Sequence, residues 1–315
     1  MKKSILIAVL TASIATSAFA QWKPAGDKIK TKWAEQVNPE NVLPEYPRPV
    51  MERGEWKNLN GLWNYAITEK GAAPSAYEGQ ILVPFAIESS LSGVGKKVGP
   101  DKELWYQRTF TVPASWKGKK VMLNFGAVDW KADIWVNDIK AGQHTGGFTP
   151  FSLDITAALA TKGDNKLVVK VWDPTDRGPQ PRGKQVNRPE GIWYTAVTGI
   201  WQTVWMEPVA ERHITNVRTT SDIDRKKLTV DVTSCPSEVV EVKVFDGKQL
   251  VATGKGLNGQ TIDIQMPADA KLWSPASPTL YSMQIALLSN GKVTDKVDSY
   301  TAMRKYSTRR DKDGI

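Results

Sequence analysis

Short runs of alternating apolar and polar residues recur along most of the chain. The clearest of them occupy residues 120–125, 132–137, 166–172, 203–207, 228–233, 239–245, 261–265 and 280–288. Pairs of turn-forming residues stand between them, namely Asn137-Asp138, Gly146-Gly147, Gly163-Asp164, Asp246-Gly247 and Asn290-Gly291. Alternation with a period of two gives a strand one buried and one solvent-facing side, and short strands joined by tight turns are typical of antiparallel sandwiches. The pattern predicts an all-β protein.

The distribution of tryptophan divides the chain into two parts. Ten of the 13 tryptophans lie between Trp56 and Trp205, and only Trp273 follows them. We therefore predict a jelly-roll β-sandwich at residues 46–209 and an immunoglobulin-like β-sandwich without a disulfide at residues 211–303, because the two lengths suit these folds. Residues 21–45 contain three prolines and show no clear period, so we expect an extended N-terminal arm there.

Three tryptophans, Trp63, Trp135 and Trp205, stand within strand-like runs. An indole buries a large apolar area when it enters a core. We therefore expect all three side chains in the interior rather than at a ligand.

Residues 1–20 have the features of a secretory signal peptide. Lys2 and Lys3 precede a short apolar run, and Ser17-Ala18-Phe19-Ala20 gives a small-x-small cleavage site before Gln21. The run is shorter than the ~20 apolar residues that span a bilayer, and no later stretch reaches that length. We expect an exported protein, periplasmic or secreted, without insertion into a membrane.

Charge and reactive side chains argue against several functional classes. The formal net charge is +9, but Lys and Arg are scattered among Asp and Glu, whereas a nucleic-acid partner requires a coherent basic face. Cys235 is the only cysteine, and His144 and His213 are the only histidines, which are too few ligands for a zinc site. We expect no cofactor, no metal ion and no nucleic-acid partner.

Residues 174–191 interrupt the rhythm of the strands. They contain four prolines and three glycines in 18 positions, and irregular loops of this length are often functional. Polar and charged side chains are set into the segment, and Trp193 and Tyr194 follow it directly. Planar polar groups beside aromatic rings suit a sugar site, because a pyranose offers hydroxyls and an apolar C–H face. A rigid loop that packs against a neighbouring domain is an equally good interpretation.

A series of motifs follows in order along residues 56–305. They are Leu59-Asn60-Gly61-Leu62-Trp63, Val83-Pro84-Phe85, Glu88-Ser89, Leu91-Ser92-Gly93, Leu104-Trp105-Tyr106-Gln107-Arg108-Thr109-Phe110, Phe125-Gly126-Ala127-Val128-Asp129, Trp135-Val136-Asn137-Asp138, Phe148-Thr149-Pro150-Phe151, Asp154-Ile155-Thr156, Thr198-Gly199-Ile200-Trp201-Gln202, Leu272-Trp273-Ser274-Pro275 and Met303-Arg304-Lys305. Each motif is short, but the ordered series resembles glycoside hydrolase family 2, which includes β-galactosidases, β-glucuronidases and β-mannosidases.

The resemblance implies a sugar-binding jelly roll, an immunoglobulin-like domain and then a catalytic (β/α)₈ barrel with two glutamates. Such a barrel needs about 250 residues, and ten follow Lys305. We therefore expect residues 304–315 to be a truncated linker toward a missing C-terminal barrel. The chain is then the N-terminal fragment of an exported retaining β-glycosidase, has no catalytic residues and is inactive alone.

The resemblance also suggests which residues contact carbohydrate, because loops of the first domain line the substrate pocket in this family. The candidates are Asp176, Arg182, Lys184, Glu190, Trp193 and Tyr194. A free-standing carbohydrate-binding module and a structural or adhesive pair of sandwiches remain alternatives.

Other carboxylates do not replace the missing pair. Asp173 with Asp176, and Glu88 with Glu103, are the pairs we considered, but nothing in the sequence gives them the unequal pKa values that a glycosidase needs. Asp173 is better explained as the first residue of an Asx-Pro turn.

Overall fold

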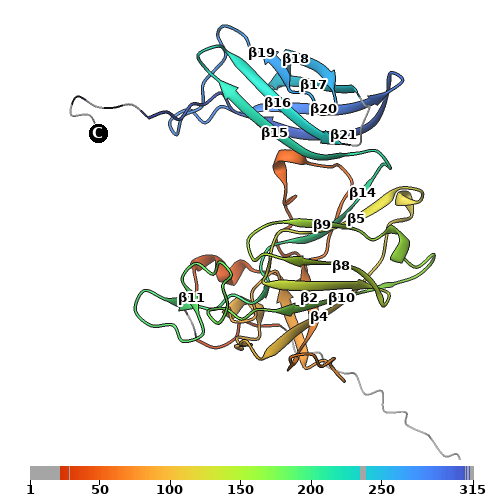
Figure 1. The fold of residues 1–315 in the computed structure, drawn as a ribbon, viewed down its shortest axis with the longest axis vertical. Helices are drawn as coiled ribbons and strands as arrows, with labels where there is room; N and C mark the ends of the chain where they lie inside the picture. Colours follow the sequence, from red (N-terminus) through yellow and green to blue (C-terminus); the bar gives the residue numbers. More distant parts are fainter. Residues whose placement is uncertain (1–21, 28, 235–238, 309, 311, 313–315) are drawn as a thin grey trace, which may run out of the picture.

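The computed structural model describes residues 22–27, 29–234, 239–308, 310 and 312. The predicted signal peptide and Cys235 lie outside these residues. Figure 1 shows two separate bodies of strands, one above the other, and no α-helix in the described part of the chain. The prediction of an all-β protein is confirmed. Among the described residues, no helix is long and apolar enough to cross a membrane.

The first sandwich consists of two antiparallel sheets. The larger one has the order β3-β2-β4-β10-β7-β8 and the smaller one β1-β14-β5-β9. The strands of the larger sheet are β2 (Gly61–Glu69), β3 (Gly79–Val83), β4 (Lys102–Phe110), β7 (Lys131–Val136), β8 (Ile139–Thr145) and β10 (Asn165–Trp172). Those of the smaller sheet are β1 (Lys57–Asn58), β5 (Lys120–Phe125), β9 (Phe151–Asp154) and β14 (Val204–Val209). Sequence neighbours alternate between the sheets in several places, as in a jelly roll.

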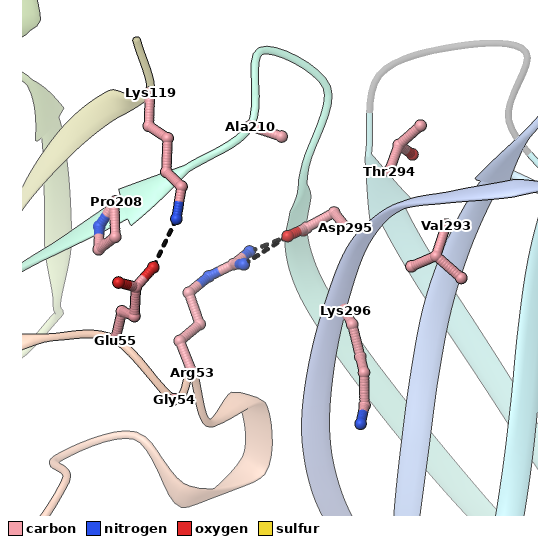
Figure 2. A pocket seen from close by; sticks show the side chains of 10 residues that line it. All are labelled: Arg53, Gly54, Glu55, Lys119, Pro208, Ala210, Val293, Thr294, Asp295 and Lys296. Carbon is pink, nitrogen blue, oxygen red and sulfur yellow. Dashed lines mark hydrogen bonds and ion pairs between the residues drawn. The ribbon is translucent and has the colours of Figure 1, made fainter. Parts of the chain in front are cut away.

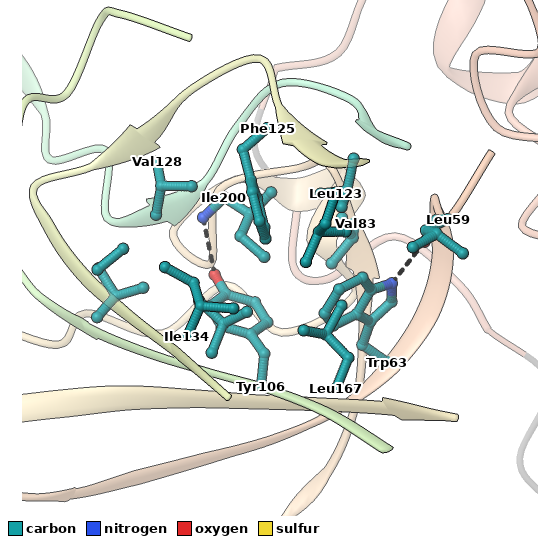
Figure 3. Packing of buried hydrophobic residues seen from close by; sticks show 14 of the residues in the cluster. Leu59, Trp63, Val83, Tyr106, Leu123, Phe125, Val128, Ile134, Leu167 and Ile200 are labelled. Carbon is teal, nitrogen blue, oxygen red and sulfur yellow. Dashed lines mark hydrogen bonds between the residues drawn. The ribbon is translucent and has the colours of Figure 1, made fainter. Parts of the chain in front are cut away.

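Strict alternation along the strands builds the core between these sheets. In β10 the odd-numbered residues from Asn165 to Val171 are buried and the even-numbered ones face outward. Trp63 and Tyr106 are the largest fully buried side chains among the described residues, and Figure 3 shows them within the hydrophobic core. Their polar atoms are satisfied, because Trp63 Nε1 donates to the Leu59 carbonyl at 2.8 Å and the Ile200 amide donates to the Tyr106 hydroxyl at 3.2 Å.

The expectation for the three tryptophans is confirmed at two positions and wrong at the third. Trp63 and Trp205 are buried. Trp135 is half-buried on the outer face of the six-stranded sheet, because the residues of β7 in the core are the even-numbered Ala132, Ile134 and Val136. The alternation was visible in the sequence, but the hydrophobic Trp135 occupies an outward position.

The second sandwich also consists of two antiparallel sheets, in the orders β15-β16-β19 and β18-β17-β20-β21. Its strands are β15 (Ile214–Asp222), β16 (Lys227–Ser234), β17 (Val239–Asp246), β18 (Gln249–Leu257), β19 (Ile262–Gln265), β20 (Tyr281–Ser289) and β21 (Lys292–Thr301). Val230, Val242 and Ile285 are among the fully buried aliphatic residues between these sheets. This architecture and size are those of an immunoglobulin-like sandwich.

The segment before the first sandwich packs on the second one. The 3₁₀ helix η2 (Pro49–Met51) lies directly beneath β15 and β21 in Figure 1, and Met51 belongs to the hydrophobic core of the second sandwich. The backbones of Glu52 and Asp298 exchange two hydrogen bonds, at 2.8 and 3.0 Å. Residues 49–52 therefore act as an additional edge of the second sandwich.

A cluster of charged residues, which we call the interdomain cluster, fixes this arrangement. Arg53 is 6% exposed and donates to both carboxylate oxygens of Asp295, at 2.7 and 2.9 Å, and to the Ile214 carbonyl at 2.9 Å. Arg48 and Tyr46 donate to Glu207 at 2.5 and 2.7 Å. Burial by itself would lower the pKa of Arg53, but Asp295 outweighs it and raises that pKa. Since Glu207 belongs to β14 and Asp295 to β21, the cluster joins the two sandwiches.

A cavity of about 390 Å³ opens beside the Arg53–Asp295 pair. Its walls come from both sandwiches, and Figure 2 shows them with a second ion pair, Lys119 with Glu55, at its edge. The first sandwich contributes Lys119 and Pro208, the second contributes residues 293–296, and Ala210 belongs to the connection between them.

Replacing Arg53 by alanine should destabilise the protein strongly. The change leaves the buried Asp295 carboxylate without its cation, and breaking a buried pair costs about 3–5 kcal/mol. Chemical denaturation followed by tryptophan fluorescence measures the loss. Lys102→Ala is the control, because the Lys102–Glu69 pair is exposed at 3.7 Å and such pairs contribute less than about 1 kcal/mol. Equal losses in the two variants would contradict the role assigned to Arg53.

Candidate functional site

A long connection between β10 and β14 emerges from one end of the first sandwich, where Figure 1 labels β11. We call residues 174–197 the polar loop. Within it β11 (Gln185–Val186) and β12 (Tyr194–Thr195) form a short parallel pair, in which Gln185 lies opposite Tyr194. The loop then leads into β13 (Gly199–Ile200), which pairs with β6 (Val128–Asp129).

One carboxylate holds both ends of the polar loop. Asp173 accepts hydrogen bonds from the Thr175 amide at 2.7 Å and the Thr175 hydroxyl at 3.0 Å, and from the Thr198 hydroxyl at 3.0 Å. The contact with the Thr175 amide is an Asx turn with Pro174 inside it, as the sequence predicted. Glu88 accepts a further bond from the Thr198 amide at 3.0 Å. The loop therefore starts and ends at fixed points.

Gly199 follows this anchor and admits no side chain. A Cβ atom at this position would lie 2.0 Å from the Tyr106 hydroxyl oxygen. The glycine thus lets the loop return close to the buried Tyr106, whose hydroxyl accepts from the next amide.

Hydrogen bonds within the polar loop restrict it further. Gln180 donates to the Thr175 carbonyl at 2.7 Å, and the side chain of Asn187 donates to the Asp176 carboxylate. The Trp193 amide closes a turn on the Glu190 carbonyl at 3.0 Å. Gly191 stands inside that turn with a φ of 58°, in the region that favours glycine.

The rigid loop presents its aromatic residues to solvent. Trp193 and Tyr194 are 41% and 61% exposed, and Ile192 beside them is also exposed. The Arg182 guanidinium lies 5.8 Å from the Trp193 ring centre and the Lys184 ammonium 5.9 Å from that of Tyr194. Within about 6 Å of a ring face, cations are attracted by the ring quadrupole.

The six predicted site residues therefore divide into groups. The structure brings together Arg182 with Trp193, and Lys184 with Tyr194, as two cation–aromatic pairs. Glu190 is exposed at the turn beside them. Asp176 is directed into the loop, where hydrogen bonds from Asn187 outweigh the effect of burial and lower its pKa.

Three buried carboxyl groups lie at the base of the polar loop. Glu88, Asp129 and Asp173 are all buried. Burial, with a smaller contribution from the Asp173 charge, raises the pKa of Glu88 to about 7. Burial and the charges of Asp173 and Glu88 raise the pKa of Asp129 to about 7, and burial raises that of Asp173.

The structure forms one of the two carboxylate pairs suggested by the sequence and not the other. The charge of Asp176 contributes to the raised pKa of Asp173. Glu88 interacts with Asp173 and Asp129, whereas Glu103 lies 3.3 Å from the Lys170 ammonium on the outer face of the six-stranded sheet. Sequence reasoning does not single out Asp129, because Glu88, Asp129 and Asp173 lie in three separate segments that only the fold brings together. Glu88 and Asp173 bind the polar loop and are buried, so we assign them to positioning the loop. Among the described residues, no three His, Cys, Asp or Glu side chains are placed to hold a metal ion.

Comparison with known proteins identifies both sandwiches. Residues 96–204 match the model of the glycosyl hydrolase 2 galactose-binding domain-like family, and residues 203–304 match that of glycosyl hydrolases family 2. A β-glucuronidase from Paenibacillus borealis is 27% identical over 284 residues, which are 82% of this chain and 47% of that protein. A β-galactosidase from Thermoanaerobacter pseudethanolicus is 28% identical over 222 residues, 66% of this chain and 29% of that protein.

Solved structures show the same fold. A Lactobacillus rhamnosus β-glucuronidase superimposes with a TM-score of 0.64 at 26% identity. The match covers 79% of this chain and 45% of the β-glucuronidase chain. A Ruminococcus gnavus β-glucuronidase in complex with D-glucuronic acid gives a TM-score of 0.65 at 22% identity, over 83% of this chain and 48% of that one. The chain thus spans about half the length, or less, of these relatives.

The buried carboxyl groups predict a loss of stability as the pH rises. Glu88 and Asp129 have pKa values of about 7 in the folded protein, whereas in an unfolded chain such groups release their protons near pH 4. Between these values the folded state holds more protons, so the free energy of unfolding falls as pH rises from about 4 to about 7 and then levels off. Glu88→Gln keeps an oxygen for the Thr198 amide and cannot ionise. Between about pH 4 and about pH 7 the free energy of unfolding of this variant should therefore fall less than that of the parent chain, by about 1 kcal/mol or more.

Melting temperatures at pH 5, 6, 7 and 8, followed by circular dichroism, test this. Glu69→Gln is the matched control, because Glu69 is exposed. If Glu88→Gln and the parent chain lose stability in parallel over this range, the buried carboxyl group at position 88 does not titrate as expected.

Proposed function

Because the chain is built from the galactose-binding-like and immunoglobulin-like domains of glycoside hydrolase family 2, we propose that it is the non-catalytic N-terminal part of a retaining β-glycosidase. Its role is to supply one wall of the substrate pocket and to hold that wall in place. The names of its relatives favour a β-glucuronide or β-galactoside as the substrate of the whole enzyme. The predicted signal peptide supports export to the periplasm or the medium.

The exposed aromatic pair on an anchored loop carries the proposal. Trp193 and Tyr194 remain in solvent on a segment that Asp173 and Glu88 hold at both ends. A large apolar ring costs free energy in water, so a rigid loop that keeps two rings exposed is suited to a partner. The partner here is carbohydrate together with the catalytic domain.

The loop residues divide the work of recognition. The ring faces of Trp193 and Tyr194 can stack on the C–H face of a pyranose. Arg182 and Lys184 stand beside them and can donate hydrogen bonds to hydroxyl or carboxylate oxygens of the sugar. Because the hydrogen bonds inside the polar loop already fix its backbone, little conformational entropy is lost when the sugar binds.

The chemistry of hydrolysis belongs to another domain. A retaining glycosidase needs two carboxyl groups about 5–5.5 Å apart on either side of the scissile bond, with access for substrate and water. In the described part of the chain, the carboxyl groups with pKa values of about 7 are buried beneath the polar loop. We propose a C-terminal (β/α)₈ barrel as the partner that supplies the catalytic glutamates.

The chain by itself should not hydrolyse aryl β-glycosides. The purified chain, incubated with chromogenic β-D-glucuronides, β-D-galactosides and β-D-mannosides, should release aglycone at the rate of buffer. The proposal would be overturned if the chain released aglycone faster than buffer and Glu88→Gln or Asp129→Asn abolished this activity. Such a result would place a catalytic pair within these two sandwiches.

A free-standing carbohydrate-binding module is the second candidate, and the exposure of Trp193 favours it as well. Calorimetric titration with glucuronides and galactosides separates the two. The pocket wall of an enzyme should bind sugar too weakly to measure without its barrel. Millimolar or tighter binding that Trp193→Ala abolishes and Trp33→Ala preserves would establish the module instead, since Trp33 is exposed on the N-terminal arm.

A further inference from the structure

The outer face of the six-stranded sheet combines tryptophan with lysine. Trp105 on β4, Trp135 on β7 and Trp172 on β10 all point away from the core and are half-buried. The rings of Trp105 and Trp135 stack with centres 6.0 Å apart and an interplanar angle of 17°. Three indoles thus form a partly exposed aromatic surface that the core of the sandwich does not require.

A lysine accompanies each of these indoles. The ammonium of Lys70 lies 3.6 Å from the ring centre of Trp172, that of Lys170 lies 5.8 Å from Trp105, and that of Lys140 lies 5.9 Å from Trp135. Register explains one of the pairs, because Lys170 lies directly opposite Trp105 on the neighbouring strand. The aromatic surface is therefore lined with positive charge.

A cavity of about 130 Å³ lies at one end of this surface. Its walls are Lys70, Glu103, Lys131, Asp133, Lys170 and Trp172. Lys170 lies 3.3 Å from Glu103 and 3.4 Å from Asp133, and Asp133 also pairs with Lys140 at 2.8 Å.

Two of the lysines at the cavity are left without a counter-ion. Within the described residues, neither Lys70 nor Lys131 has a carboxylate within 4.0 Å, and both are exposed. Counting Lys70, Lys131, Lys140 and Lys170 against Glu103 and Asp133, the face has two positive charges in excess. The cavity therefore suits a small anionic group.

We propose that this face binds an acidic glycan. A carboxylate or sulfate ester of the sugar enters the cavity beside Lys70 and Lys131, while the chain of pyranose rings lies along Trp172, Trp105 and Trp135. Glu103 and Asp133 at the floor accept hydrogen bonds from sugar hydroxyls. The site is separate from the polar loop and does not depend on the proposed glycosidase.

The same features favour a glycan over a nucleic acid. A nucleic-acid site needs a continuous basic stripe for many phosphates. Here only two charges are in excess, and the two lysines without a counter-ion lie together at one cavity instead of along a stripe. Flat indoles instead match the apolar C–H face of a pyranose, and the buried hydrogen-bond acceptors match its hydroxyl groups.

Affinity electrophoresis of the whole chain tests the site. Gels contain polygalacturonate, a sulfated galactan, neutral dextran or a single-stranded oligodeoxynucleotide. We expect retardation by one or both acidic glycans and not by dextran, and the two acidic gels distinguish carboxylate from sulfate. The double variant Lys70→Ala/Lys131→Ala should weaken that binding at least tenfold.

The control is Lys162→Ala/Lys248→Ala, which removes the same charge from two exposed positions elsewhere. Circular dichroism confirms that both double variants fold, which is expected because all four side chains are exposed. The proposal fails if no acidic glycan retards the chain, if the oligodeoxynucleotide retards it equally, or if the control variant loses as much affinity as the Lys70/Lys131 variant.

Discussion

The buried guanidinium of Arg53 determines how the two sandwiches stand to each other. Its residue precedes the first sandwich in sequence, but its hydrogen bonds go to Asp295 and Ile214 of the second. Because a charge removed from water is stable only with its partner in place, the 46–53 segment is held between the sandwiches. Each sheet of the first sandwich has one face in the core, and this segment covers part of the outer side of the four-stranded sheet at Glu207. The two proposed sugar sites lie on other surfaces, namely the polar loop and the outer face of the six-stranded sheet.

Buried carboxylates serve a second structural purpose at the base of the polar loop. A loop of this length would lose much conformational entropy on being ordered, and Asp173 and Glu88 offset that loss by binding both of its ends. Their burial raises their pKa values. Ionising these two groups above neutral pH therefore lowers the free energy of unfolding. Perturbed carboxyl groups in a glycosidase family would ordinarily suggest catalysis. Here their hydrogen bonds explain them as supports of the loop.

The proposed division between support and chemistry agrees with the match of the two sandwiches to models of glycosyl hydrolase family 2. The two sandwiches offer rigid surfaces with exposed aromatic rings, which can orient a sugar. Among the described residues, the carboxyl groups with pKa values of about 7 are buried beneath the polar loop. In the proposed function, these two sandwiches form one side of a sugar pocket, and the interdomain cluster holds them in a fixed relation to each other.

The sequence alone determined the all-β class, the family and the polar loop, because alternation, turn residues and ordered motifs are local properties of the chain. It also identified the Asx turn at Asp173, whose donor is two residues away. Tertiary structure alone decided that Glu88 meets Asp129 and Asp173, and that Arg53 reaches Asp295. These outcomes depend on which distant strands become neighbours. A pattern read along one strand does not contain that information, since contacts across sheets and between sandwiches are set by packing and by the pairing of buried charges.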